Sequence, residues 1–508
     1  MLANRLTLDP TVRVLLLEAG GSDDVPEVHI PALFPLLIAS EKDWGYRTVE
    51  QTHTGTQISV PRGKMVGGSS SMNAMVYIRG NRADYDGWRD EFGAKGWGYE
   101  DVLPYFVRAE GNSRLAGPLH GTHGPLRVED VTYLHELNQA WVDSAITWGL
   151  TRNDDFNGES QLGAGPFQVT CHDGRRWSVA DAYLHPVTSR PNLTVRTHTQ
   201  VSAVLIEGSR AVGVRYHDGN AEVTVHATAE VLLCGGSINS PQLLMLSGVG
   251  PADHLRAHGI DIVVDLPGVG QNLHDHPTVP IIWFTRDTTD IIDQAMEPWV
   301  MTEWQTTRTG PLASNLCGVG AFLSTTGDVT RPDIQLHTAP TAFADGLVRP
   351  DRPTFTGTVS LLDPRSRGTL RLHSADPEDR PELDLALYRD PADFDTIAAG
   401  VRAFIQMSSS GPLARFLDRP LLPDRNDLHD QAFARFMRQR TQTMYHPAGT
   451  CAMGTGEQAV VDPSSLRVHG VDGLRVIDAS VMPRLPRGNT NAPTVMTAEK
   501  AADLILGK

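Results

Sequence analysis

The chain has 508 residues, which is long enough to bury a sizeable core and to form more than one domain. Its 44 Lys and Arg against 60 Asp and Glu give a net charge of −16 at pH 7, which disfavours binding to nucleic acid or to anionic membrane surfaces. With 40% apolar and 20% charged residues, 47 Gly and 34 Pro, the composition is typical of a loop-rich α/β enzyme and excludes a disordered or fibrous chain.

Cysteine usage and hydropathy predict the compartment. Cys171, Cys234, Cys317 and Cys451 lie far apart without a C-x-x-C pair, so neither a disulfide framework nor a zinc cluster is indicated. The longest strongly apolar stretch, residues 30–39, is too short to span a membrane, and the first residues lack the apolar core of a signal peptide. We therefore expect a cytoplasmic protein with no transmembrane segment, with peripheral attachment to a membrane as the alternative.

The beginning of the chain has the pattern of a dinucleotide-binding unit. Residues 2–8 predict a helix, and residues 12–17 (VRVLLL) predict a buried parallel strand that ends at Glu18. An acid at this position of such a unit accepts hydrogen bonds from ribose hydroxyls. The glycine fingerprint, expected about 20 residues before that acid, falls outside the chain. The alternative role of Glu18 is a solvated strand end.

Two glycine-rich turns are predicted to border a ligand site. Residues 62–73 (RGKMVGGSSSMN) can cradle a pyrophosphate or a flavin edge with backbone N–H groups and hydroxyls, although the composition also fits a flexible linker. Residues 231–246 (VLLCGGSINSPQLLML) predict a buried strand, a turn and a helix that starts with Ser240 as N-cap and Pro241 as first residue.

A histidine-rich segment, residues 266–277 (LPGVGQNLHDHP), contains His274, Asp275 and His276. The ligand spacing of a metal site is missing there. A turn with capping polar groups is the favoured interpretation, and a metal site is the alternative.

The last part of the chain contains a histidine and an asparagine that are candidate catalytic residues. His446, in residues 445–454 (YHPAGTCAMG), precedes a proline and is expected in an extended segment that can aim its imidazole. Asn491 is predicted to open a C-terminal helix, as an N-cap or as a group at the positive end of the helix dipole, where developing negative charge is stabilised. A lone histidine is usually structural, so the motif leaves both roles open.

Five stretches together resemble the glucose-methanol-choline (GMC) oxidoreductases, in the branch of choline and aliphatic alcohol dehydrogenases. They are residues 63–80, 234–251, 266–277, 445–454 and 478–503, and they span most of the chain. The resemblance implies an α/β fold, with a Rossmann-like FAD-binding domain interleaved with an α+β substrate domain that is built on an antiparallel sheet.

The implied domains are discontinuous. The FAD-binding domain would comprise residues 1–130, 178–276 and 440–508, and the substrate domain residues 131–177 and 277–439. Within the substrate domain the sequence predicts strands over residues 333–337, 354–362 and 368–373 and a helix over residues 391–407.

The resemblance also implies the site residues. FAD would be bound by Glu18 at the adenosine ribose, by Gly67, Gly68, Ser69 and Asn73 at the diphosphate and flavin, by Val201 at the adenine, by Asp478 and Ala479 at the ribityl and phosphate region, and by Asn491, Ala492 and Thr494 beside the flavin pyrimidine. His446 and Asn491 would form the catalytic pair, with His446 taking the hydroxyl proton as a hydride passes to flavin N5. Met72 stands where some relatives attach FAD through a histidine, so noncovalent FAD is expected.

The chain departs from the family at its start, because members carry a strand and the glycine fingerprint before the first helix. This predicts a gene whose start was placed too late or, if the chain begins here, a protein that folds poorly and holds FAD weakly. The function would be oxidation of a primary alcohol, choline-like or aliphatic, to the aldehyde. The alternatives are a flavin-deficient, non-catalytic remnant and a lyase or decarboxylase on the same scaffold.

The sequence leaves the substrate and the electron acceptor open. A choline cation would need an acidic group or an aromatic cage, for which Trp299, Glu303 and Trp304 are candidates by residue type alone. The acceptor is either a quinone or oxygen.

Overall fold

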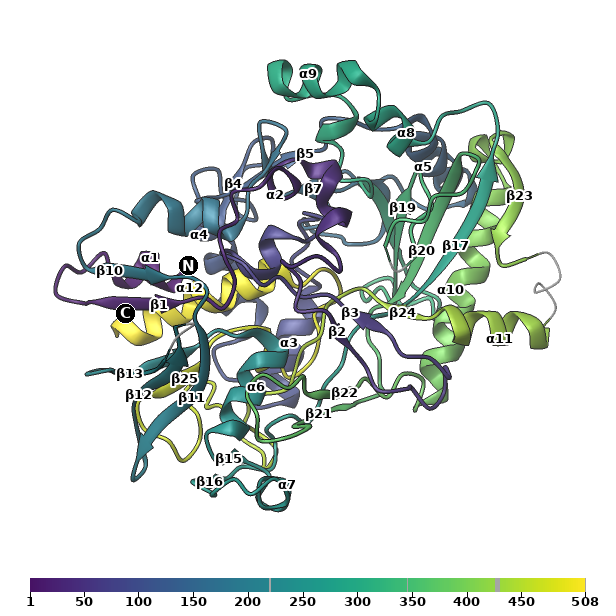
Figure 1. The fold of residues 1–508 in the computed structure, drawn as a ribbon. Helices are drawn as coiled ribbons and strands as arrows, with labels where there is room; N and C mark the ends of the chain where they lie inside the picture. The colour runs from purple at the N-terminus through teal and green to yellow at the C-terminus, as the bar shows by residue number, and fades with distance from the viewer. Residues whose placement is uncertain (219–220, 345, 425–429, 508) are drawn as a thin grey trace.

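The computed structural model describes residues 1–218, 221–344, 346–424 and 430–507, which form a mixed α/β fold (Figure 1). A large antiparallel sheet with α10 (Pro391–Ser409) occupies one side of the molecule, and small sheets with the N-terminal and C-terminal helices occupy the other. The described part of the chain contains no helix that is long and apolar enough to cross a membrane.

Two short parallel pairs form separate two-stranded sheets on the terminal side. Strand β1 (Val14–Leu17) pairs with β10 (Leu193–Arg196), and β14 (Val231–Leu233) pairs with β25 (Leu474–Val476). Within the described ranges β1 and β14 each have this one strand partner, and they share no neighbour. The strand predicted near residues 12–17 is confirmed, but not its full burial: Leu15 is 37% exposed because it lines a cavity.

Helix α6 (Gly236–Leu246) follows β14, as the strand-turn-helix pattern predicts. Its predicted start was wrong, since the helix begins at Gly236 and Pro241 lies inside it. The φ of Gly236 is +79°, which a glycine adopts without strain, and its N–H donates to Asp478. The hydroxyl of Ser240 also donates to Asp478 instead of capping the helix.

The large sheet has the strand order β23-β17-β20-β19-β18-β6, with β24 paired to β17, and all of its pairs are antiparallel. Its strands are β6 (Gly163–Pro166), β17 (Pro277–Thr285), β18 (Val319–Leu323), β19 (Ile334–Ala339), β20 (Thr354–Leu361), β23 (Leu417–Leu422) and β24 (Gln442–Thr443). Helices α10 and α5 (Glu136–Trp148) pack against it. A Cβ on Gly357 would collide with the ring of Phe404 from α10, so this glycine allows the close approach.

The strands and the helix predicted within residues 333–407 are all present, as β19, β20, β21 (Thr369–Arg371) and α10. Where one domain ends and the next begins stays a prediction. The strands of the large sheet come from the segments assigned to the substrate domain, except β24.

The C-terminal helix α12 (Asn491–Leu506) ties the two ends of the chain together. It runs from the centre of the molecule toward β1 and packs against α1 (Leu2–Leu6) and α4 (Tyr99–Ala109) (Figure 1). Arg5 of α1 forms a 2.6 Å ion pair with the fully buried Glu499 of α12, which also accepts from the hydroxyl of Tyr183. Both oxygens of the Glu499 carboxylate accept hydrogen bonds, which offsets part of the cost of burying its charge.

The remaining elements connect these parts. The other helices are α2 (Pro26–His29), α3 (Arg82–Glu91), α7 (Ala252–Ala257), α8 (Ile291–Ala295), α9 (Pro298–Thr307) and α11 (Asp430–Arg440). The other strands are β2 (Tyr46–Arg47), β3 (Ser59–Val60), β4 (Glu110–Asn112), β5 (Leu126–Asp130), β7 (Gln168–Val169), β8 (Cys171–His172), β9 (Arg175–Arg176), β11 (Gln200–Glu207), β12 (Arg210–His217), β13 (Glu222–His226), β15 (Val249–Gly250), β16 (Val264–Asp265) and β22 (Glu382–Asp384).

Candidate active site

A cavity of about 1610 Å³ lies between the small sheets and the large sheet. It extends from β1 and β14, past the two glycine-rich turns and the start of α12, to side chains of β17, β19 and β20. The volume exceeds the roughly 300–1,000 Å³ of an ordinary small-molecule pocket. Part of it is bordered by β1 and β14, each of which has one strand partner in the described residues.

The residues that the sequence singled out meet at this cavity. The following line it: Glu18, Gly67, Gly68, Ser69, Asn73, Val201, His446, Asp478, Ala479, Asn491 and Thr494. Ala492, in the first turn of α12, is 3% exposed and does not line the cavity. Residues that lie up to several hundred positions apart in sequence therefore share one space.

Glu18 lies at the carboxyl end of β1, where its N–H donates to the carbonyl of Arg196. One carboxylate oxygen accepts the N–H of Gly20 at 2.7 Å. Burial raises the pKa of Glu18 to about 7, and the Gly20 N–H and Lys64 oppose that shift. A carboxyl group in this position suits neutral donors such as hydroxyls, which it can bind in either protonation state.

The turn at Gly67 and Gly68 needs glycine for two different reasons. Gly67 has φ +85°, and a Cβ there would collide with the hydroxyl oxygen of Ser71. Gly68 has φ +55°, but a Cβ there would meet no protein atom within 4 Å. Open space beside a cavity-lining glycine leaves room for a ligand to approach the backbone.

Two of the predicted cofactor residues use their side chains on protein groups. The Asp478 carboxylate accepts four hydrogen bonds, from the N–H groups of Gly236 and Ser480 and from the hydroxyls of Ser240 and Ser480. Oδ1 of Asn73 accepts from Arg176, at 2.9 Å. These side chains hold the two glycine-rich turns in place, and a direct contact of Asp478 with a ligand would have to replace one of its bonds.

His446 and Asn489 lie together at one end of the cavity. Nδ2 of Asn489 lies 3.4 Å from Nε2 of His446, and Oδ1 of Asn489 accepts from Gln335 at 3.1 Å. In the described residues, Asn489 is thus the amide that faces His446, whereas Asn491 is the first residue of α12, with Thr490 as the N-cap. From the sequence, only the second asparagine of residues 489–491 (the N-T-N run) is a candidate, and the contact with His446 adds Asn489 as a second one.

Burial lowers the pKa of His446 well below its ordinary value of 6.5, and His276, Arg62 and His337 lower it further. The guanidinium of Arg62 donates to the carbonyl of Tyr445, directly before His446. The imidazole of His446 is therefore neutral at physiological pH and carries one lone pair that can accept a proton.

The histidine-rich segment contacts His446 at this end of the cavity. Nδ1 of His276 lies 3.0 Å from Nδ1 of His446, and Oδ1 of Asp275 accepts the backbone N–H groups of both histidines. Nε2 of His274 accepts the N–H of Leu485. The predicted turn is confined to residues 267–270 of this segment, whereas His274 to His276 lie beyond it and His274 is bridged to Ala448; one of the histidine side chains reaches His446.

The three residues considered for a choline cage lie elsewhere. Trp299 is 57% exposed on α9, and the indole of Trp304 donates to the carbonyl of Gly174. Neither they nor Glu303 lines the cavity. Described side chains around its His446 end include the guanidinium of Arg62 and the neutral Thr278, His337, Thr338, Leu316 and Phe343.

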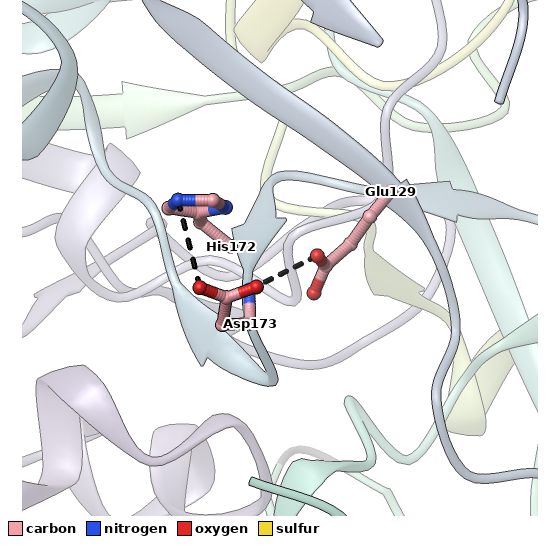
Figure 2. Close-up of side chains that lie close together, drawn as sticks. All are labelled: Glu129, His172 and Asp173. Carbon is pink, nitrogen blue, oxygen red and sulfur yellow. Dashed lines mark hydrogen bonds and ion pairs between the residues drawn. The ribbon is translucent and has the colours of Figure 1, made fainter. Parts of the chain in front are cut away.

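A second group of titratable side chains, Glu129, His172 and Asp173, lies close together on the surface (Figure 2). Their ligand atoms lie within 4.8 Å of one another. The Glu129 oxygens already accept the backbone N–H groups of Asp173 and Gly174, and the side chain of Asp173 is 83% exposed. The group closes the β8–β9 turn and does not line the cavity.

Two profiles of the GMC oxidoreductase family match the chain, over residues 37–278 and 364–498. The chain belongs to this family. It is 40% identical to the alcohol dehydrogenase [acceptor] of Pseudomonas putida over all of its own length and 94% of that protein. It is 41% identical to the mitochondrial choline dehydrogenase of Homo sapiens, over all of its length and 88% of that protein.

Solved structures of GMC oxidoreductases share the fold. Pyridoxine 4-oxidase from Mesorbium loti has a TM-score of 0.89 and 30% identity, over 99% of this chain and 96% of that one. A variant of formate oxidase from Aspergillus oryzae has a TM-score of 0.92 and 28% identity, over 100% of this chain and 96% of that one. The predicted α/β fold with an FAD-binding part and a sheet-based substrate part is confirmed.

FAD is the cofactor of this GMC oxidoreductase, as the sequence predicts, and the cavity fits it. The volume has room for a dinucleotide and a small substrate, Glu18 offers an acceptor for ribose hydroxyls, and Gly68 and Gly236 leave open space beside the backbone. The N-terminus of α12 lines the same cavity and presents the positive end of its dipole.

Proposed function

We propose that this protein oxidises a primary alcohol to the aldehyde, with His446 as the base. The observation that carries the proposal is the pairing of a neutral, buried imidazole with the Asn489 amide at one end of the cavity that holds FAD. When bound, FAD supplies the acceptor, at flavin N5, for the hydride that leaves the alcohol carbon.

His446 and Asn489 have different roles toward the substrate hydroxyl group. Nε2 of His446 takes the hydroxyl proton, since His446 lines the cavity and its pKa is low enough to keep it neutral. Nδ2 of Asn489 donates a hydrogen bond to the substrate oxygen and stabilises the charge that develops there. Asn491 and Thr494, in the first turn of α12, lie where the helix dipole favours negative charge on the cofactor.

Within this reaction we favour a neutral aliphatic alcohol over choline. Three acidic side chains of the described residues line the cavity, and all are at the sheet end: Glu18 directly follows β1, Glu230 directly precedes β14 and Asp478 follows β25. Glu230 is paired with Arg475, and Asp478 accepts four hydrogen bonds. A trimethylammonium group beside His446 would instead meet Arg62 and apolar side chains.

The test is anaerobic mixing of the purified yellow protein with primary alcohols. Bleaching of the flavin absorbance supports alcohol oxidation, and a yellow protein that no alcohol bleaches favours a lyase or decarboxylase. A colourless protein that takes up no added FAD favours the non-catalytic alternative. Oxygen consumption against reduction of an added quinone identifies the acceptor, and release of the flavin by acid precipitation tests noncovalent binding.

A further inference from the structure

The imidazoles of His276 and His446 form a direct contact behind the cavity. Their rings are nearly perpendicular, at 87°, and their Nδ1 atoms are 3.0 Å apart. His276 is fully buried, immediately before β17, and it lies 170 positions from its partner in the chain. Two nitrogens at this distance share one proton, so one of them donates and the other accepts.

Both rings are neutral, so each carries one proton. Burial lowers the pKa of His276 to about 4, and burial followed by His276, Arg62 and His337 lowers that of His446. A neutral imidazole is a donor at one nitrogen and an acceptor at the other. The direction of the Nδ1–Nδ1 bond therefore fixes which nitrogen of His446 keeps the lone pair.

The surroundings of the two rings decide the direction. The backbone carbonyls of Leu362 and Pro486 raise its pKa against the effect of burial, as acceptors of an imidazole N–H do. Since Nδ1 is turned to His446, the nitrogen available to these carbonyls is Nε2, which is buried and makes no hydrogen bond of ordinary geometry with the described residues. On the other side of the pair, Nδ2 of Asn489 is a donor and lies 3.4 Å from Nε2 of His446, so this nitrogen carries the lone pair and the proton of His446 belongs on Nδ1.

We propose that His276 is a positioning residue that accepts the Nδ1 proton of His446 and thereby fixes the tautomer in which Nε2 of His446 is free to act as the base. The opposite tautomer would place a proton on Nε2 and leave no acceptor for the substrate hydroxyl. Asp275 supports the arrangement, because one of its oxygens accepts the N–H groups of both histidines, at 2.8 and 2.9 Å. The catalytic consequence rests on the function proposed above, whereas the tautomer does not.

The experiment is nitrogen NMR of protein labelled with ¹⁵N-histidine, which reads the tautomer of each imidazole. The His446 signals are assigned by their loss in His446→Ala, and His258→Leu, at the end of α7 and outside the cavity lining, controls for removal of a histidine. We expect wild-type His446 to carry its proton on Nδ1. Observation of the proton on Nε2 would overturn the proposal.

Two substitutions of His276 test whether this residue fixes the tautomer of His446. His276→Leu removes the acceptor and should give His446 a mixed tautomer, with a fall in the rate of flavin reduction by an alcohol of about 10- to 100-fold and a smaller change in KM. His276→Asn places an oxygen near the position of Nδ1 and should restore the tautomer and most of the rate. An unchanged His446 tautomer in His276→Leu contradicts the proposal. If the leucine variant fails to fold, the wild-type and His276→Asn tautomers decide.

The outcomes separate this inference from the proposed function. A wild-type His446 with its proton on Nδ1 and a flavin that no alcohol bleaches would remove the alcohol reaction and leave the His276–His446 relationship standing. Alcohol oxidation by a protein whose His446 carries its proton on Nε2 would leave the alcohol reaction standing and remove both the role of His276 and that of Nε2 as the base.

Discussion

Nδ2 of Asn489 lies 3.4 Å from Nε2 of His446, while Asn491, two residues further, begins α12. The two asparagines of the N-T-N run thus face different parts of one cavity. Asn489 faces His446, and Asn491 lies at the positive end of the helix dipole.

Removal of the base should abolish most of the chemistry. His446→Ala is expected to slow anaerobic flavin reduction by an alcohol by about 10²- to 10⁴-fold, because that is the usual contribution of a positioned general base. Stopped-flow absorbance measures the rate, and the flavin spectrum confirms that cofactor is still bound. Reduction at nearly the wild-type rate would refute the role of His446.

The two asparagines should differ in what they control. Asn489→Ala is expected to slow flavin reduction by about 10²-fold or more, because it removes a donor to the developing oxyanion. Asn491→Ala, its matched control, should slow reduction by less than about tenfold and weaken retention of FAD, because its group faces the cofactor. Reduction rates and FAD dissociation constants for both variants check this, and a larger rate loss in Asn491→Ala would restore the pair expected from the sequence.

The pH dependence follows from the environment of His446. Its pKa is lowered below 6.5 by burial first and then by His276, Arg62 and His337, so the neutral form that accepts a proton dominates at and above pH 6.5. We expect kcat/KM for an alcohol to stay level from about pH 8 to about pH 6.5 and to fall only at lower pH, as His446 becomes protonated. A profile that already drops between pH 8 and 7 would mean that the base titrates near its ordinary value.

The substrate preference can be measured with a matched pair of alcohols. Choline and its neutral isostere, in which a tert-butyl group replaces the trimethylammonium group, have nearly the same shape. Because Arg62 and apolar side chains line the His446 end of the cavity, we expect a higher kcat/KM for the isostere, by about tenfold or more. A preference for choline would show that a negative group reaches the substrate cation.

Substitution of the adjacent Gly67 and Gly68 should have different effects, on protein stability at Gly67 and on FAD binding at Gly68. Gly67→Ala should destabilise the flavin-free protein by roughly 2–5 kcal/mol, because of the positive φ and the collision with Ser71. Gly68→Ala should cost only about 1–2 kcal/mol, for its positive φ. It should nevertheless weaken FAD binding, because the methyl group enters the open space. Thermal unfolding of flavin-free protein and FAD titration test both variants, and unchanged FAD affinity in Gly68→Ala would show that the cofactor does not approach this turn.

The local elements were largely determined by the sequence. The aliphatic run before Glu18, the strand-turn-helix around β14 and the alternating residues of β19 and β20 form where their patterns predict, because hydrophobic periodicity and glycine turns act over a few residues. The family motifs also located the cavity wall, since nearly all of the residues drawn from them line it.

The tertiary structure decided which side chains face one another. Nothing in the spacing of the N-T-N run shows that Asn489 meets His446, because that depends on where α12 begins. The contact between His276 and His446 joins segments 170 residues apart. The sequence pattern around His276 does not indicate that it meets His446. Trp299 and Trp304 fitted a cation cage by type but lie away from the cavity. Residue type and local pattern are properties of the sequence, whereas a shared proton or a cavity wall exists only once distant segments pack together.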